Sequence, residues 1–214
     1  MLKIKNVEIY SRKNQMAIIA FLLVIAIGIM TKFSDGGILG EEKIYNILGG
    51  NNRNIILLNI AKFFAFIGSP KFLIPIIPVV FLFSLYINKR IFSLGLLLST
   101  AGSYLMNQLI KTIFQRPRPT DFMLMSESSF SYPSGHTMTN TCLYLFLAYY
   151  FSKNKDENTR KLYYFIAIVF SGMMGMSRVY LGVHYISDVV GGFLVAYFFY
   201  HFSTEFLKKS KLTQ

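Results

Sequence analysis

The sequence is poor in three kinds of residue, and each shortage excludes something. Cys142 is the only cysteine, so no disulfide can form within the chain, and we expect it to be a small buried hydrophobe. Charged residues make up 15% of the chain, against about 25% in soluble domains, which disfavours an ordinary soluble protein. Tryptophan is absent, and tyrosines near the ends of apolar runs are expected to take its interfacial role: Tyr10, Tyr86, Tyr132, Tyr180 and Tyr185.

Apolar residues are abundant, at 53%, and they occur in long runs instead of alternating with polar ones. Crossing the hydrocarbon core takes about 20 mostly apolar residues, and flanking side chains can make up a small shortfall. We therefore predict an all-α polytopic membrane protein with six transmembrane helices. Because no repeat, low-complexity tract or long linker interrupts the chain, residues 1–214 are expected to form a single integral-membrane domain. The six runs are 16–30, 72–87, 91–110, 137–151, 162–176 and 185–200, and Asp188 is the only charged residue in them.

The segment 34–70 differs from these runs because residues 36–37 and 49–52 carry turn signals. Its apolar part, Ile55–Ile67, is short for a clean span. One interpretation is an interfacial helix between the first and second transmembrane helices. The alternative is an early start to the second span, broken near residues 68–70. The first apolar run follows a basic stretch, but no small-residue cleavage site comes after it, so we expect a retained helix and not a signal peptide.

The net charge of +12 could indicate nucleic-acid binding, but the placement of the basic residues argues against it. Thirteen of the 22 Lys and Arg fall in short loops and tails on one side of the six-span topology. By the positive-inside rule this side is cytoplasmic. The prediction is a multi-pass plasma-membrane protein with both termini inside and no nucleic-acid partner. The thirteen are Lys3, Lys5, Arg12, Lys13, Lys89, Arg90, Lys153, Lys155, Arg160, Lys161, Lys208, Lys209 and Lys211.

Three polar clusters fall at span ends that the topology brings to the opposite, outer face. In the first, Lys111 ends the third run, and the prolines around Arg118 force an extended chain. Taken alone, this cluster would be interpreted as a snorkelling Lys111 and arginines that merely flank a span. The second is Pro133-Ser134-Gly135-His136, in which Ser134 is a plausible N-cap. The free N–H groups of a helix start and its dipole favour an anion there.

The third cluster contains Arg178, His184 and Asp188. His184 and Asp188 are four residues apart and would share a face of a helix. The carboxylate can then hold the proton of one ring nitrogen and leave the other as a nucleophile. A carboxylate in an apolar helix is costly and needs a partner. His201, near the inner end of the last run, is read as structural.

The three clusters, in this order, resemble the three-part signature of the type 2 phosphatidic acid phosphatases. The matching patterns are Lys-x6-Arg-Pro at 111–119, Pro-Ser-Gly-His at 133–136 and Ser-Arg-x5-His-x3-Asp at 177–188. Every defining position matches, within a motif-bearing core of residues 105–200. The hydropathy resembles the membrane branch of the family, which acts on lipid phosphates, and not its soluble acid phosphatases or vanadium haloperoxidases. Within this branch, the sequence is similar to small bacterial phosphatidylglycerophosphatases and undecaprenyl-diphosphate phosphatases.

The resemblance implies a phosphatase that works through a phosphohistidine, with no cofactor. His184 would be the nucleophile, Asp188 would orient it, and His136 would be the general acid. Lys111, Arg118 and Arg178, with the backbone around Ser134 and Gly135, would bind the phosphate oxygens, so no metal is expected. The outer loops hold carboxylates that are read as solvated: Asp35, Glu41, Glu42, Asp121 and Glu127.

The lipid itself is not encoded in any pattern that can be read. An outer-face site favours undecaprenyl diphosphate, with phosphatidylglycerophosphate and phosphatidic acid as alternatives. Two other classes are less favoured. A transporter would place its charges near the bilayer midplane, and a non-catalytic lipid-binding protein would be expected to lack one of the two histidines. The sequence says nothing about oligomeric state.

Overall fold

The computed structural model describes residues 2–34, 37–38, 40–48 and 53–210, and this part of the chain folds entirely into helices and their connections. Predictions made for Asp35, Lys211 and the turn residues 36 and 49–52 fall outside the described residues, as do the side chains of Lys3, Lys5 and Tyr10. The helices are α1 (Leu2–Lys32), α2 (Glu42–Ile47), α3 (Ile55–Ile67), α4 (Pro70–Tyr86), α5 (Arg90–Leu97), α6 (Ser103–Phe114), α7 (Gly135–Ser152), α8 (Glu157–Tyr180) and α9 (Ile186–Lys209).

Polar side chains start several of these helices, as the sequence predicted for Ser134. Asn54, Ser69, Ser134 and Asp156 are the N-caps of α3, α4, α7 and α8, and each side chain accepts a hydrogen bond from a backbone N–H of the first turn. Helix α6 ends at Gln115, which adopts a left-handed conformation with φ 50°. These local signals fix where the loops begin.

Helices α5 and α6 are joined without a loop by a π-helical turn, η1 (Leu98–Gly102). The hydroxyls of Thr100 and Ser103 bond back to the carbonyls of Leu96 and Ser99 in this stretch. The two helices therefore continue one another along the third apolar run.

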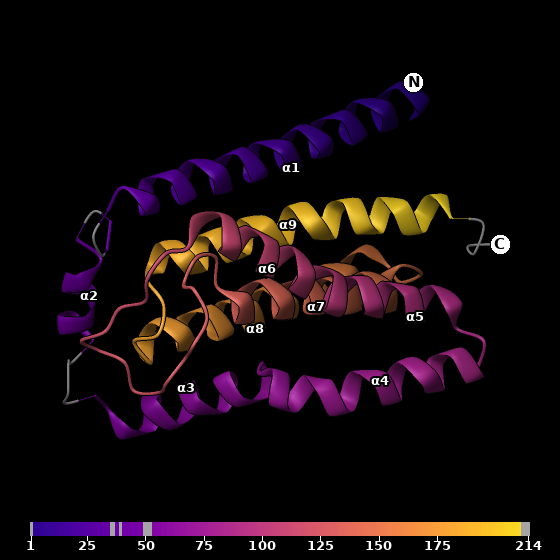
Figure 1. Ribbon diagram of the computed structural model, residues 1–214. Coiled ribbons are helices and arrows are strands. Elements are labelled where there is room, and N and C mark those ends of the chain that lie inside the picture. Colours follow the sequence, from indigo (N-terminus) through magenta and orange to yellow (C-terminus); the bar gives the residue numbers. More distant parts are fainter. Residues whose placement is uncertain (1, 35–36, 39, 49–52, 211–214) are drawn as a thin grey trace.

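The long helices lie side by side, with α7 packed against α8, α9 and α6 (Figure 1). The start of α1 and the end of α9 lie at one end of the bundle. The other end carries α2, the long loop between α6 and α7, and the turn between α8 and α9. This arrangement gathers the ends of α6 and α8 with the starts of α7 and α9, as alternating chain direction requires.

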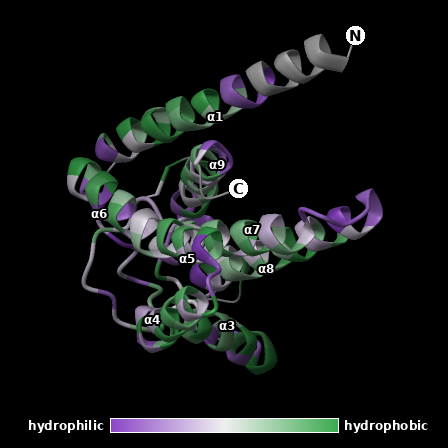
Figure 2. Ribbon diagram, turned by 90° about the vertical axis from the view of Figure 1, so that its right-hand side faces the viewer, coloured by the Kyte–Doolittle hydropathy of each residue, from purple (hydrophilic) through white to green (hydrophobic). Residues whose placement is uncertain are grey.

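The outer faces of the helices are apolar. Figure 2 shows hydrophobic residues along α1, α3 and α4. Large side chains such as Leu22, Leu82 and Phe165 are 58%, 63% and 64% exposed. An exposed apolar surface of this extent is typical of contact with lipid.

Within the described residues, three helical stretches are long and apolar enough to cross a membrane, namely Arg12–Lys32, Glu157–Tyr180 and Ile186–Lys209. Helices α3 and α4 qualify together as a fourth, bent by 42° at their junction. Since α3 also packs along α8, the geometry favours the broken second span over a separate interfacial helix. The count of six spans stays a prediction.

Two of the tyrosines predicted at the interface are buried instead. Tyr132 is fully buried and donates its hydroxyl proton to the carbonyl of Val24, which ties the loop after α6 to α1. Tyr185 is 4% exposed and packs with Val179 and Val189. The interfacial prediction was wrong for both because each side chain packs into the interior, Tyr132 against α1 and Tyr185 within a cluster that includes Tyr45 of α2. Tyr86, at 87% exposed, agrees with it.

The loop after α6 is fixed against the turn between α8 and α9. Gly182 has φ +69°, and a Cβ there would lie 2.0 Å from the carbonyl oxygen of Phe122. Leu124 donates its backbone N–H to Leu181 at 3.0 Å in the same contact. Only glycine combines this backbone conformation with this close approach.

We expect Gly182→Ala to lower the free energy of unfolding by about 2 kcal/mol or more, from left-handed strain and steric overlap. Gly172→Ala is the matched control, because a Cβ at this position of α8 meets nothing within 4 Å. Alanine is favoured over glycine inside a helix, so the control should be neutral or stabilising. Thermal unfolding in detergent measures both, and equal midpoints would contradict this account of the loop.

Candidate active site

The residues singled out from the sequence converge at the end of the bundle opposite the start of α1 (Figure 1). Distances that join different clusters demonstrate the convergence. Arg118 Nη1 lies 3.1 Å from His184 Nε2, and the backbone N–H of Ser134 donates to the carbonyl of Asp188 at 2.9 Å. Lys111 lies near the end of α6, Arg118 in the next loop, Ser134, Gly135 and His136 at the start of α7, Arg178 in the last turn of α8, His184 before α9 and Asp188 in its first turn.

His184 and Asp188 meet, but not by sharing a helix face. Helix α9 begins at Ile186, so His184 lies in the preceding loop and the assumption of a helical pair was wrong. Asp188 is the third helical residue, and its Oδ2 accepts the backbone N–H of Tyr185 at 2.9 Å, as in a capping box. The same Oδ2 lies 3.3 Å from His184 Nδ1.

The hydrogen bonds around His184 define its tautomer. Arg118 carries only donors, so the contact of its Nη1 with Nε2 requires an unprotonated Nε2. The ring proton is then on Nδ1, beside Asp188 Oδ2 and 3.2 Å from Ser131 Oγ. Ser131 in turn donates to Asp188 Oδ2 at 2.5 Å. Nε2 therefore keeps its lone pair for a nucleophilic attack.

The surroundings of His184 keep its ring neutral. Burial lowers the pKa of His184 well below the usual value, because the charged form loses its hydration. The cations of Arg118, Lys111, Arg178 and Arg116 lower the pKa further. A neutral imidazole at neutral pH is the form that can attack phosphorus.

Asp188 is fully buried and its two oxygens have different partners. Oδ1 accepts a hydrogen bond from Arg116 Nη1 at 2.6 Å, within a buried ion pair. Oδ2 faces His184, Ser131 and the N–H of Tyr185. These contacts stabilise an ionised carboxylate without water. Neither Arg116 nor Ser131 was singled out from the sequence, although Arg116 belongs to the Arg-Pro-Arg-Pro stretch and could have been noticed there.

The start of α7 is shaped by packing as well as by its N-cap. Ser134 Oγ accepts the backbone N–H of Thr137, and Asn107 of α6 donates to the carbonyl of Pro133 at 3.1 Å. A Cβ at Gly135 would lie 2.9 Å from Asn107 Oδ1. Glycine is thus required by the contact with α6, in addition to the close ligand approach inferred from the sequence.

His136 lies in the first turn of α7, and the cations of Arg178 and Arg118 are near enough to influence its ring. Asn140, one turn later, donates both to the carbonyl of His136 at 2.9 Å and to the carbonyl of Gly68 at the α3–α4 junction. The bend between α3 and α4 therefore supports the position of His136.

Oxygen atoms of one loop segment contact all three phosphate-binding candidates. Glu127 forms an ion pair with Arg178 and lies 3.9 Å from Arg118. Ser129 Oγ accepts from Lys111 at 3.1 Å and from Arg118 at 3.0 Å, and the carbonyl of Phe130 accepts from Lys111. An incoming phosphate would exchange these oxygens for its own.

Two of the loop carboxylates predicted to be solvated are instead paired, so that prediction was wrong for them. Glu127 forms an ion pair with Arg178 and lies close to Arg118. Glu41 is 8% exposed and forms an ion pair with Arg116 at 3.0 Å. Glu42 and Asp121 are exposed, as predicted. His201 is 6% exposed and its Nε2 lies 2.7 Å from Asn14 Oδ1 in α1, a contact that fits the structural interpretation.

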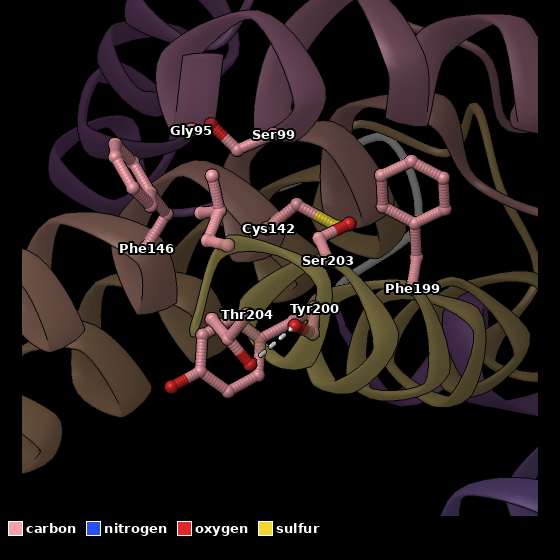
Figure 3. Close-up of a pocket in the computed structure, with 9 residues that line it drawn as sticks. Gly95, Ser99, Cys142, Phe146, Phe199, Tyr200, Ser203 and Thr204 are labelled. Atoms are coloured by element: carbon pink, nitrogen blue, oxygen red, sulfur yellow. Dashed lines mark hydrogen bonds between the residues drawn. The ribbon is translucent and has the colours of Figure 1, made fainter. Parts of the chain in front are cut away.

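A separate small cavity between α5, α7 and α9 is not part of this site (Figure 3). It holds about 10 Å³, enough for at most one water molecule. Cys142 lines it and is 1% exposed, which confirms the prediction of a buried small residue. The hydroxyl of Thr204 donates to the carbonyl of Tyr200 there.

We expect Glu127→Gln to strengthen binding of orthophosphate and vanadate, because the neutral amide competes less well for Arg178. A charged hydrogen bond of this kind contributes about 1.5–3 kcal/mol, so the dissociation constant should fall by about 10-fold or more. Asp121→Asn, an exposed carboxylate of the same loop, is the control. Titration calorimetry in detergent measures both. Weaker binding in Glu127→Gln would mean that Glu127 supports the cations instead of competing for them.

Residues 92–211 match the PAP2 superfamily. Over 129 residues the chain is 39% identical to phosphatidylglycerophosphatase B of Bacillus subtilis, covering 59% of this chain and 64% of that relative. The alignment thus spans slightly less than two thirds of the relative's length.

Two solved structures resemble the fold. The crystal structure of the first transmembrane PAP2 type phosphatidylglycerolphosphate phosphatase from Bacillus subtilis matches with a TM-score of 0.79 and 30% identity, over 91% of this chain and 97% of that one. Aquifex aeolicus LpxE, at 23% identity and a TM-score of 0.59 over 76% of this chain and 93% of that one, shares the fold. The predicted all-α membrane fold and the family resemblance are confirmed. Since the match covers more than half of its length, the chain belongs to the PAP2 superfamily.

Proposed function

We propose that this protein is a lipid phosphate phosphatase that hydrolyses the phosphomonoester of phosphatidylglycerophosphate and releases orthophosphate. Membership of the PAP2 superfamily and the similarity, in sequence and in fold, to phosphatidylglycerophosphate phosphatase of Bacillus subtilis support this choice. The sequence had favoured undecaprenyl diphosphate, and the comparisons favour the alternative that it left open. The observation that carries the proposal is the unprotonated Nε2 of His184, which accepts a hydrogen bond from Arg118 while Asp188 lies beside Nδ1.

The chemistry follows from the positions of the side chains. Nε2 of His184 attacks phosphorus, the ester P–O bond breaks, and the leaving oxygen takes a proton from His136. A water molecule then attacks phosphorus and gives a proton to His136, the P–N bond breaks, and orthophosphate is released. Asp188 stabilises the positive charge that develops on the His184 ring.

Lys111, Arg118 and Arg178 would bind the non-bridging oxygens in place of Glu127, Ser129 and Phe130. Charge spreads over these oxygens in the transition state, and fixed cations stabilise it without reorganisation. Three cations supply what a metal ion would otherwise provide, so we propose a metal-independent reaction.

An apolar groove supports a substrate with long hydrocarbon chains. It has a volume of about 370 Å³ and runs between α4, α5, α7 and α8. Asn140, which contacts His136, lies among its lining residues, together with Phe72, Ile76 and Phe170. A lipid with its phosphate at His184 could place a chain in this groove.

We further propose that the site faces outward and that both termini are cytoplasmic in a multi-pass topology. The positive-inside pattern of the short loops supports this orientation. The motif-bearing ends of the helices lie at the opposite end of the bundle from the start of α1 and the end of α9.

Turnover of three lipids by purified protein tests the proposal. With phosphatidylglycerophosphate, phosphatidic acid and undecaprenyl diphosphate in matched detergent micelles, kcat/KM should be highest for phosphatidylglycerophosphate and unchanged by EDTA. A higher kcat/KM for undecaprenyl diphosphate would instead identify that lipid as the preferred substrate. Activity lost in EDTA and restored by magnesium would refute the metal-independent mechanism, and no phosphate release from any lipid would refute the phosphatase.

We expect the alanine variants of the two histidines to lose activity in different ways. His184→Ala cannot form the phosphoenzyme and should lose turnover on every substrate. His136→Ala keeps the nucleophile and cations but lacks the proton donor for the leaving oxygen, so its kcat/KM should fall about 10²–10⁴-fold on an alkyl phosphate and much less on an activated aryl phosphate. The measurement is kcat/KM of both variants on both substrates, because this ratio reports the steps up to departure of the leaving group and not the later hydrolysis of the phosphoenzyme. Equal losses in His136→Ala on the two substrates would exclude its role as general acid.

A further inference from the structure

A buried ion pair behind Asp188 has no part in the mechanism described so far. The side chain of Arg116 is completely buried, and its Nη1 donates to Asp188 Oδ1 and to Ser187 Oγ, each at 2.6 Å. Its Nη2 donates to Glu41 Oε2 at 3.0 Å, and the guanidinium lies 4.1 Å from the centre of the Tyr185 ring. A guanidinium with no access to water must be compensated by its neighbours, and here two carboxylates do so.

Two arginines that are close in sequence contact the Asp188–His184 pair. Arg116 and Arg118 are separated by Pro117 in the loop after α6. Arg116 contacts Oδ1 of Asp188, and Arg118 contacts Nε2 of His184. The two guanidinium groups thus bracket the Asp188–His184 pair from its opposite ends.

Glu41 comes from a distant part of the sequence, just before α2. Its Oε1 accepts the backbone N–H of Ser187 at 2.5 Å, and its Oε2 accepts from Ser187 Oγ at 2.9 Å and from the backbone N–H of Ile38 at 3.0 Å. Ser187 lies in the first turn of α9, where backbone N–H groups lack partners within the helix. Glu41 therefore caps, from outside, the helix that carries Asp188.

The charge balance around Arg116 gives a reason for its second carboxylate partner, Glu41. Arg116 alone would neutralise Asp188 and weaken its attraction for the Nδ1–H of His184. With Glu41 on the other side of the guanidinium, the three groups carry one net negative charge, and His184 lies beside it. That charge is most useful when the ring becomes cationic during phosphoryl transfer.

A second contact joins the same segment to the nucleophile. Tyr45 of α2 is 1% exposed, and its hydroxyl donates to the backbone carbonyl of His184 at 2.8 Å. Its ring stacks on Phe122 of the loop after α6, with centroids 4.8 Å apart. The segment before and within α2 thus holds both the carboxylate and the backbone of the catalytic pair.

We propose that Glu41 and Arg116 are positioning residues that hold Asp188 ionised and oriented toward His184, so that the segment between α1 and α3 completes the active site. The proposal rests on the proposed phosphatase function. Neither residue contacts the phosphate-binding cations Lys111 or Arg178 through a hydrogen bond found in the described residues. Their loss should therefore affect the chemical step and leave substrate binding intact.

The test compares Glu41→Gln with Glu42→Gln in the full-length protein, using turnover of an alkyl phosphate and inhibition by orthophosphate. Glu42 is the matched control because it is the next residue, exposed, and bonded only to the backbone N–H of Gly37 among the described contacts. Hydrogen-bond partners behind the ligands of metal sites typically contribute about 10–100-fold, and we expect an effect of similar size behind Asp188. We expect Glu41→Gln to lower kcat by about 10-fold, with KM and the inhibition constant of orthophosphate changed by less than about threefold, and Glu42→Gln to match the wild type.

A double-mutant cycle with Arg116→Met tests whether Glu41 acts through Arg116. Coupled residues are not additive, so Glu41→Gln should cost nothing further once Arg116 is gone. If Arg116→Met does not fold, the isosteric Glu41→Gln decides alone, with its thermal midpoint as the check on folding. A wild-type kcat in Glu41→Gln, a loss confined to KM, or additive losses would overturn the proposal. An inactive wild type would instead refute the phosphatase function, so the two failures are distinguishable.

Discussion

The burial of one carboxylate, Asp188, organises this end of the molecule. An ionised group without access to water must be compensated by hydrogen bonds and an opposite charge. Asp188 obtains these from the first turn of its own helix, from Ser131 and from Arg116. Since Arg116 and Ser131 lie at the two ends of the loop after α6, compensation of this charge also fixes that loop, and Glu41 extends the network to the segment before α2.

The same loop performs two tasks on opposite sides of His184. Behind the ring it supplies Arg116 and Ser131, which hold Asp188. In front it supplies Arg118, which covers Nε2, and Glu127, which pairs with Arg178. Oxygen atoms of the loop thus already pair with the cations, so a phosphate that binds here would exchange with these oxygens and would not fill an empty charged pocket.

The sequence predicted most of what depends on order along the chain. Apolar runs predicted the helices, and alternating direction brought Lys111, His136, Arg178 and His184 to one end. What it could not predict depends on contacts between distant segments. Glu41 and Glu127 resemble solvated loop carboxylates until Arg116 and Arg178 are brought beside them. Tyr132 resembles an interfacial tyrosine until its hydroxyl meets Val24. The helical spacing of His184 and Asp188 suggested the right pair through the wrong geometry, because a capping box also joins residues near the start of a helix.

The central claim is that Asp188 holds the proton of Nδ1 and leaves Nε2 of His184 to attack phosphorus. Rapid quenching of the protein with a labelled lipid phosphate, at alkaline pH where phosphohistidine survives, followed by digestion and phosphorus NMR, tests it most directly. The account predicts a phosphoryl group on His184 bonded to Nε2. A phosphoryl group on Nδ1, on His136, or on no residue under conditions of rapid turnover would contradict it.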